Sequence, residues 1–229
     1  MSRLLTLTLS LAVIFCTLGA HGAEVRHHDV RLADYAVNRI SVIGDSYTTG
    51  GDEGGNRTKG WTTQVWRALT EHGIAVTPTV AAEGGAGYCT HGNRGSVFED
   101  LTVRAVKPAD ALVVFFGSRN DMNVDPSRLS VAMYGTFKLA RQIARTAKFL
   151  VVGPAWPTAD PPPAVLRIRD VLGYQAQLAG ANFVDPIAAR WFVGKPDLIG
   201  ADGVHPTDAG HTYMAEKLAP LIGGQLNPY

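Results

Sequence analysis

Residues 39–44 have the sequence RISVIG, a short apolar run that ends in glycine and continues directly into Asp45 and Ser46. Apolar runs of about four to eight residues bounded by turn residues are typical of buried strands. Four further runs of this kind alternate with segments of helical periodicity along the chain. Because strands that alternate with helices favour a parallel sheet covered on both faces, we predict an α/β fold with three layers and a five-stranded parallel sheet.

The expected elements follow one another as strand and helix along the whole chain. The expected strands are residues 39–44, 74–82, 111–116, 149–153 and 182–185. The expected helices are residues 61–72, 96–106, 126–147, 164–178 and 207–222. No internal repeat or low-complexity linker divides this series, so we expect one domain after the N-terminal segment.

The N-terminal segment has the features of an export signal. Arg3 supplies a positive charge, residues 4–18 are almost uninterruptedly apolar, and small residues follow at Gly22 and Ala23. This order of charge, short apolar stretch and small residues is that of a signal peptide. We therefore expect residues 1–23 to be a signal peptide and residues 24–229 to form the mature domain, secreted or in the cell envelope without a membrane span. An uncleaved N-terminal anchor is the alternative.

The mature chain is close to electroneutral. The full sequence has 21 Lys and Arg against 20 Asp and Glu, and Arg3 is the only charged residue of the signal segment. Bulk electrostatics therefore predict no binding to nucleic acid or to an anionic membrane. Cys89 is the only cysteine after that segment, so no intramolecular disulfide can form. We interpret Cys89 as a packing residue, since no neighbouring feature would lower the pKa of its thiol.

Residues with complementary chemistry follow the carboxyl ends of three expected strands. Ser46 follows the first strand, Gly85 the second and Asn120 the third. Ligands of open parallel sheets bind beyond the carboxyl ends of the strands, so we expect these residues to converge. Asp202 and His205 lie in the loop before the last expected helix. Together they offer a hydroxyl, an imidazole, a carboxylate and an amide, which are the parts of an acyl-transfer site.

General chemistry suggests a role for each of these residues. A serine hydroxyl needs a base within hydrogen-bond reach, and His205 is the natural candidate for activating Ser46. Asp202 could accept a hydrogen bond from the other ring nitrogen and fix the tautomer. The Ser46 and Gly85 backbone N–H groups and the Asn120 side-chain amide could stabilise the oxyanion of a tetrahedral intermediate. Gly87 is the alternative to Gly85.

Several other side chains compete for these roles. Asp185 ends the fifth expected strand and is a weaker candidate for the acid, and Asp121 is expected to hold its own loop. His91 and His211 are rival bases, although we expect His211 on the surface of the last helix. The histidine pair at residues 27–28 has no other metal-ligating residues clustered with it, so we expect neither a metal site nor a cofactor.

Four segments of the chain resemble the conserved blocks of the SGNH, or GDSL-type, hydrolase family, in the right order along nearly the whole mature chain. Gly44-Asp45-Ser46 matches the first block, Gly85 looks like the second-block glycine, Gly117 with Asn120-Asp121 resembles the third, and Asp202 with His205 matches D-x-x-H. The resemblance implies a flavodoxin-like α/β/α sandwich, metal-free ester hydrolysis and an accessible active site. It also implies that Ser46 is the nucleophile.

The sequence departs from the family pattern in three places. Tyr47 stands where the family usually has leucine, which changes local packing without removing a catalytic group. The third block, residues 117–121, is one residue longer than the simplest Gly-x-Asn-Asp form. The second block contains Gly84, Gly85 and Gly87, of which Gly85 is chosen by its distance from the strand end.

The leading hypothesis is an exported serine esterase that hydrolyses carboxylic esters through an acyl-enzyme on Ser46. Its substrate would be a small-molecule or glycan-linked ester: a lipid, a short-acyl compound or an acylated carbohydrate. One alternative is an acyltransferase, which would transfer the acyl group from the same acyl-enzyme to another acceptor. The alternative from a different class is a non-catalytic carbohydrate-binding protein, in which tryptophan side chains would stack on sugar rings. Residues 49–60 and 155–163 are expected to border the acyl site. No G-x-S-x-G or phosphate-binding motif supports another enzyme class.

Overall fold

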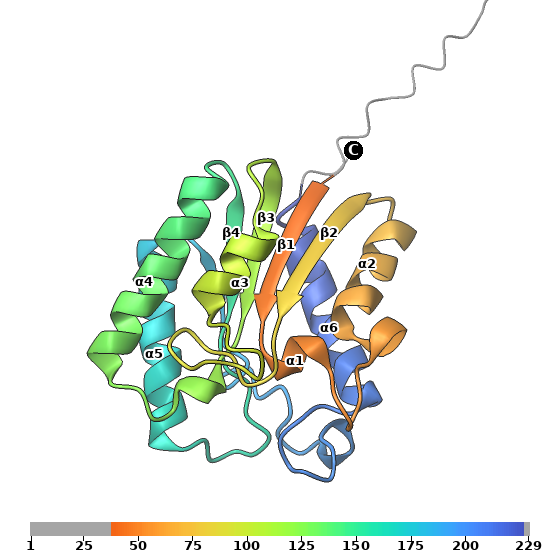
Figure 1. The fold of residues 1–229 in the computed structure, drawn as a ribbon. Coiled ribbons are helices and arrows are strands. Elements are labelled where there is room, and N and C mark those ends of the chain that lie inside the picture. Colours follow the sequence, from red (N-terminus) through yellow and green to blue (C-terminus); the bar gives the residue numbers. More distant parts are fainter. Residues whose placement is uncertain (1–37, 227–229) are drawn as a thin grey trace, which may run out of the picture. The chain divides into compact units, whose positions relative to one another are not determined.

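The computed structural model describes residues 38–226, which form a parallel sheet with helices on both faces (Figure 1). Its strands are β1 (Asn38–Gly44), β2 (Val76–Ala82), β3 (Asp110–Phe116), β4 (Lys148–Val152) and β5 (Asn182–Val184). Every neighbouring pair is parallel, and the order across the sheet is β2-β1-β3-β4-β5. This is the flavodoxin-like order, so the predicted three-layer fold with five parallel strands is confirmed.

The helices alternate with the strands along the chain, in the predicted order. The helices are α1 (Ser46–Thr49), α2 (Trp61–Glu71), α3 (Phe98–Ala105), α4 (Pro126–Ile143), α5 (Pro163–Leu178) and α6 (Asp208–Gly223). Three short 3-10 turns complete the described chain: η1 (Arg57–Lys59), η2 (Arg119–Asp121) and η3 (Pro196–Leu198). The short α1, directly after β1, was not predicted. It brings Ser46 into the first turn of a helix at the carboxyl edge of the sheet.

The end of α4 differs from the prediction of a helix over residues 126–147. The helix ends at Ile143, and Ala144 leaves the helical conformation with φ −110° and ψ 78°. The Arg141 side chain then donates a hydrogen bond to the carbonyl of Ala147 at 2.5 Å, which fixes the turn into β4. Apolar periodicity continues through these residues, so the sequence pattern did not mark the end of the helix.

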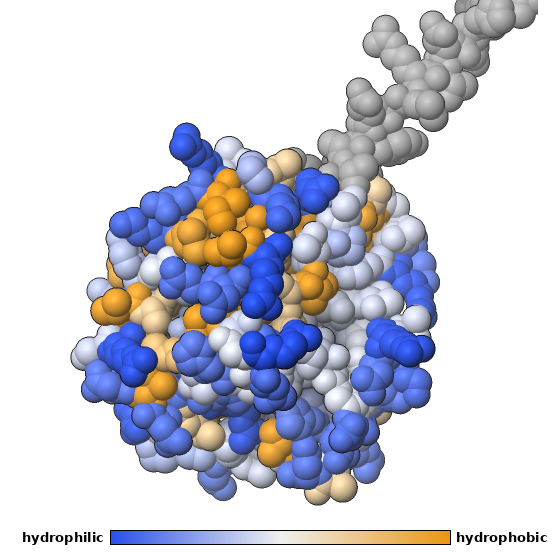
Figure 2. Space-filling model, viewed as in Figure 1, coloured by the Kyte–Doolittle hydropathy of each residue, from blue (hydrophilic) through white to orange (hydrophobic). Residues whose placement is uncertain are grey.

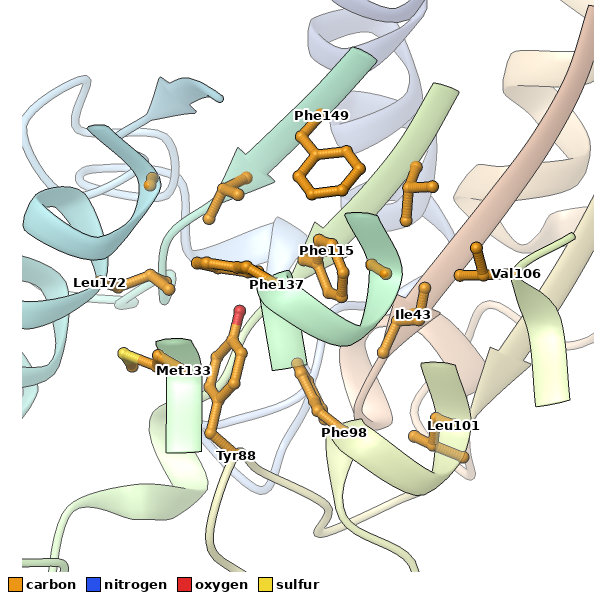
Figure 3. Close-up of a cluster of buried hydrophobic side chains, with 14 of the residues drawn as sticks. Ile43, Tyr88, Phe98, Leu101, Val106, Phe115, Met133, Phe137, Phe149 and Leu172 are labelled. Atoms are coloured by element: carbon orange, nitrogen blue, oxygen red, sulfur yellow. The ribbon is translucent and has the colours of Figure 1, made fainter. Parts of the chain in front are cut away.

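Two hydrophobic cores form because successive residues of a strand point to opposite faces of the sheet. On one face, Ile43, Phe115 and Phe149 pack with residues of α3, α4 and α5. Figure 3 shows how these rings meet, and the Phe115 and Phe137 ring centroids are 5.0 Å apart. On the other face, β-strand side chains pack against α2 and α6. Each core therefore anchors the sheet whose carboxyl edge carries the candidate site.

On the face drawn in Figure 2, hydrophilic side chains cover most of the surface, and a hydrophobic patch lies over α3 and α4 in the upper part of the view. Within residues 38–226 no helix is both long enough and apolar enough to cross a membrane. The predicted signal peptide, residues 1–23, and the histidine pair at 27–28 lie outside the described residues.

Candidate active site

Ser46 lies at the carboxyl end of β1, at the first position of α1. The Asp45 side chain caps this helix by accepting a hydrogen bond from the Tyr47 N–H at 2.9 Å. A Cβ at Gly44 would lie 2.2 Å from the Thr48 hydroxyl oxygen, so the turn into α1 requires glycine there. The first N–H groups of a helix have no intrahelical acceptor. The turn therefore presents both the Ser46 hydroxyl and a free backbone donor.

His205 and Asp202 complete a chain of three side chains with Ser46. His205 Nε2 lies 3.0 Å from Ser46 Oγ, and His205 Nδ1 lies 2.5 Å from Asp202 Oδ2. The other Asp202 oxygen accepts hydrogen bonds from the backbone N–H groups of Val204 and His205 at 2.8 and 2.9 Å. The three residues that sequence reasoning placed in the catalytic set are thus in direct contact.

The pKa of Asp202 reflects these contacts. Desolvation would raise the pKa, but hydrogen bonds from the His205 ring and from the backbone of His205 and Val204 outweigh it and lower the pKa to about 2. Asp202 is therefore ionised at neutral pH. A carboxylate at Nδ1 holds the proton on that nitrogen and leaves Nε2 free to accept one.

Tyr47 connects the loop that carries His205 to the turn that carries Ser46. Its hydroxyl donates a hydrogen bond to the carbonyl of Val204 at 2.6 Å. Its ring is buried and makes edge contacts with Phe116 and Phe192 at centroid distances of 6.2 and 6.3 Å. The residue that departs from the family's usual leucine thus fixes the backbone between Asp202 and His205. Sequence reasoning missed this contact because it joins residues 157 positions apart.

The third predicted segment supplies an amide and a buried carboxylate. Asn120 donates from its side chain to the carbonyl of Ala86 at 2.8 Å, which orients the amide beside the first block. Asp121 is fully buried and accepts hydrogen bonds from the backbone N–H groups of residues 88, 89 and 90 at 2.8 to 3.0 Å. Asp121 therefore has the expected structural role, but it holds residues 88–90 rather than its own loop.

The structure distinguishes the two glycines considered as oxyanion donors. The Gly87 N–H donates to the carbonyl of Thr90 at 2.8 Å, and a Cβ at Gly87 would lie 2.5 Å from the Asp121 oxygens. Gly85 adopts φ 78°, and its N–H donates to no other residue within 38–226. Gly87 therefore has a packing role, and Gly85 has the available donor.

Asp45 is a buried carboxylate directly behind the nucleophile. Desolvation raises its pKa to about 7, against the lowering effects of the Tyr47 N–H, the charges of His205 and Arg119, and a hydrogen bond from Ser118. Its exposed fraction is only 2%. This group does not contact the imidazole directly and stands outside the chain of three side chains.

A cleft of about 570 Å³ opens beside Ser46 and His205. Its lining residues are Ser46, Thr49, Gly50, Gly51, Asp52, Glu53, Glu83, Gly84, Asn93, Arg94, Asp202 and His205. Among the described residues, no Val, Leu, Ile, Met, Phe or Trp side chain lines this cleft. The cleft is therefore polar, and four of its side chains are carboxylates.

Two loops shape this cleft, and one of them was predicted. Glu53, from residues 49–60, accepts a hydrogen bond from the Ala201 N–H at 3.0 Å, which joins that loop to the His205 loop. Residues 155–163 do not line this cleft, and residues 83–94 form its other wall. In this wall the buried Glu83 carboxylate accepts hydrogen bonds from the backbone N–H groups of Arg94 and Ser96.

Residues 155–163 lie instead beside the third block. The Arg119 guanidinium stacks over the Trp156 ring with 4.2 Å between its central carbon and the ring centroid. Arg119 belongs to the segment that is one residue longer than the family form. The longer segment is thus accommodated by a cation–π contact.

The structure corrects the expectation that His211 lies on the surface. Its side chain is completely buried, and its ring lies against Gly55 and within 3.4 Å of the Trp61 N–H. Burial lowers the pKa of His211 to about 4, although the nearby Asp208 charge opposes this. His211 belongs to the apolar face of α6 with Met214, Ala215, Leu218 and Ile222. That spacing was the signal that sequence reasoning overlooked.

The remaining rivals have other partners. Asp185 accepts hydrogen bonds from the N–H groups of Ile187 and Ala188, and His91 contacts the carbonyl of Gly95 at 2.8 Å. Cys89 is half-buried, and desolvation followed by the Asp121 charge raises the pKa of its thiol. A thiol with a raised pKa fits the predicted packing role.

Known proteins resemble this chain in sequence and in fold. The GDSL-like Lipase/Acylhydrolase family model matches residues 42–213. GDSL lipase Rv0518 of Mycobacterium tuberculosis is 54% identical over 229 residues, with 99% of each chain covered.

Two solved structures share the fold. The crystal structure of TesA has a TM-score of 0.66 at 23% identity and covers 82% of this chain and all of that one. A family two carbohydrate esterase from Clostridium thermocellum, solved with cellohexaose, has a TM-score of 0.65 at 19% identity and covers 82% of this chain and 65% of that one. With the family match over most of the described chain, these findings show that the chain belongs to the GDSL-like lipase/acylhydrolase family and is a serine ester hydrolase of the SGNH/GDSL type.

Proposed function

We propose that the protein is an exported esterase that removes short acyl groups from polar alcohols, acylated carbohydrates among them, through an acyl-enzyme on Ser46. The observation that carries this proposal is the continuous contact from Ser46 Oγ to His205 Nε2 and from Nδ1 to Asp202, at 3.0 and 2.5 Å. These three side chains line the cleft described above. In serine hydrolases this arrangement activates the hydroxyl by general-base catalysis.

In the proposed first half-reaction, Ser46 Oγ attacks the ester carbonyl carbon while its proton moves to His205 Nε2. Asp202 stabilises the imidazolium through Nδ1–H. The negative charge on the carbonyl oxygen meets the backbone N–H groups of Ser46 and Gly85 and the Asn120 amide. When the tetrahedral intermediate collapses, the alcohol leaves with the proton from His205, and the acyl group stays on Ser46.

In the second half-reaction, a water molecule takes the place of the alcohol. His205 accepts a proton from this water as its oxygen attacks the acyl carbon. The imidazolium then returns the proton to Ser46 Oγ, and the carboxylic acid is released. The half-buried position of Ser46 and the partly exposed Asp202–His205 pair support entry of water at this step.

The composition of the cleft supports a short acyl group and a hydroxyl-rich alcohol. Burying one methylene group is worth about 0.8 kcal/mol, but a cleft without aliphatic walls offers little of this gain to a long acyl chain. Carboxylates accept hydrogen bonds from hydroxyl groups, and Asp52 and Glu53 line the cleft. The fold similarity to a carbohydrate esterase solved with cellohexaose is in keeping with this choice.

A fluorophosphonate probe tests the covalent step. We expect the probe to add its mass to the peptide that contains Ser46, and the Ser46→Ala variant to remain unlabelled. Ser127→Ala, which changes an exposed serine at the start of α4, is the matched control and should label fully. Labelling of a peptide other than that of Ser46, or of the folded Ser46→Ala variant, would contradict the mechanism.

A series of p-nitrophenyl esters tests the substrate class separately. We expect kcat/KM to be highest for acetate or butyrate and to fall with longer chains, and acetylated oligosaccharides to release acetate. A rate that increases steadily to decanoate or longer would refute the short-acyl proposal while leaving the covalent mechanism intact.

The export part of the proposal depends on residues 1–23. Its test is the intact mass of the protein recovered from the medium or cell envelope of an expressing bacterium. We expect a chain that begins after Gly22 or Ala23. A full-length chain retained in the membrane fraction would favour the uncleaved anchor.

A further inference from the structure

A second cavity lies between α4 and α5, beside the start of β4. Its volume is about 510 Å³, within the size range of small-molecule sites, about 300–1,000 Å³. It contacts Phe149 near the amino end of β4, whereas Ser46 follows the carboxyl end of β1. As the strands are parallel, the two sites lie at opposite edges of the sheet (Figure 1). The cavity is therefore separate from the ester-hydrolysis site.

Part of the wall of this cavity is aromatic and aliphatic. Phe137 and Phe149 form its buried part. Tyr134 and Leu178 line its mouth, and 53% and 60% of these side chains are exposed. Large hydrophobic side chains that gather at a concave surface often mark a binding site. The mouth of the cavity thus offers apolar surface to a ligand body.

The charged groups of the cavity all have one sign. Lys138, Arg141 and Arg145 line it, and no carboxylate does so among the described residues. The surrounding polar groups are the amides of Gln142 and Gln175. A concave surface with three cations and no acid attracts an anion.

Arg141 is held in place before any ligand arrives. One of its terminal nitrogens donates to the carbonyl of Ala147 at 2.5 Å, and its central guanidinium carbon lies 4.0 Å from the Phe149 ring centroid. Only some of the five N–H donors of an arginine are used by such a contact. A fixed guanidinium that keeps free donors loses little entropy when it binds a carboxylate, and it matches the planar geometry of that group.

We propose that this cavity binds an amphiphilic monocarboxylate, of the class of a medium-chain fatty acid. The carboxylate pairs with Arg141, and the hydrocarbon body lies along the exposed Tyr134 and Leu178 side chains at the mouth. This class follows from the combination of apolar walls with a fixed guanidinium in one cavity. The inference is independent of the substrate proposed for Ser46.

Sodium decanoate, kept below its micellar concentration, is the probe for this site. Titration calorimetry on the full-length protein should show one saturable site, both in the wild type and after Ser46 has been blocked by a fluorophosphonate. We expect Arg141→Gln to weaken binding by about 10- to 100-fold, since hydrogen bonds to charged groups contribute about 1.5–3 kcal/mol. Arg167→Gln removes the same charge from α5 outside the cavity and should leave binding unchanged.

A second variant and a neutral ligand distinguish a specific loss of binding from a loss of folding. Leu178→Gln changes a mostly exposed side chain, so the protein should remain folded and active while decanoate binds more weakly. Decanol should bind at least about tenfold more weakly than decanoate if the carboxylate is paired. Equal binding of the two ligands, unchanged binding by Arg141→Gln, or loss of binding after Ser46 is blocked would each overturn the proposal. Binding to anionic phospholipid vesicles without saturable decanoate binding would also overturn it and would indicate a lipid surface instead.

Discussion

The hydrogen bond from Tyr47 to the Val204 carbonyl provides a sharp test of how the site is positioned. In Tyr47→Phe the ring keeps its edge contacts with Phe116 and Phe192, and only the hydroxyl is lost. A neutral hydrogen bond contributes about 1 kcal/mol, which corresponds to about fivefold in rate if the whole amount holds His205 in its reactive position. We therefore expect kcat to fall about fivefold. KM should change little because Tyr47 does not line the cleft.

The assay is the hydrolysis of p-nitrophenyl acetate at about pH 8, where an ordinary histidine is neutral. Tyr213→Phe is the matched control, because the Tyr213 hydroxyl donates no hydrogen bond to the described residues and the ring stays in contact with Phe192. Urea unfolding of both variants separates an effect on the site from an effect on stability. The reasoning is refuted if Tyr47→Phe keeps kcat within about twofold of wild type, or if Tyr213→Phe loses as much.

Three further predictions concern ionisable side chains. Asp202→Asn should lower kcat by about 100- to 10,000-fold with a modest change in KM, because the amide favours the wrong imidazole tautomer; steady-state kinetics on the same ester check this. His211 has a lowered pKa of about 4, so the unfolded chain takes up its proton first and stability falls as pH drops from about 6.5 to about 4. His211→Phe should remove this part of the pH dependence in urea unfolding. Asp45 has a raised pKa of about 7, so its contribution to stability is present near pH 4 and below and is lost as pH rises to about 7. Asp45→Asn should remove this opposite slope, and unfolding curves that keep the wild-type pH dependence in either variant would contradict the assignment.

The strands β1, β3 and β4 were predictable because buried strands consist mostly of apolar residues. The run at residues 111–116 contains no polar side chain, and β3 lies at the centre of the sheet with neighbours on both sides. The convergence of Ser46, Gly85 and Asn120 was also predictable from the rule that parallel strands present their carboxyl ends at one edge, whereas His205 was assigned to Ser46 by its chemistry. The topology of the sheet thus predicts that residues far apart in the sequence lie close together at one edge of the sheet.

The second wall of the cleft, formed by residues 83–94, was not predictable from patterns of this kind. The path of residues 83–94 depends on one carboxylate, Glu83, which collects backbone N–H groups eleven and thirteen residues later. Neither periodicity nor composition encodes such a contact. The prediction for His211 was wrong for a related reason. We expected a polar residue to lie on the surface, although its spacing from Met214 and Leu218 indicates the buried face of α6.

The nucleophile and its base come from opposite parts of the chain, 159 residues apart. Ser46 belongs to a turn that follows the first strand, whereas His205 precedes α6, which packs against α2 and the sheet. A ribosome has therefore made most of the protein before an imidazole exists to activate the serine. We therefore expect esterase activity to appear during refolding only when the Ser46–His205 contact has formed, after the C-terminal part of the chain is in place.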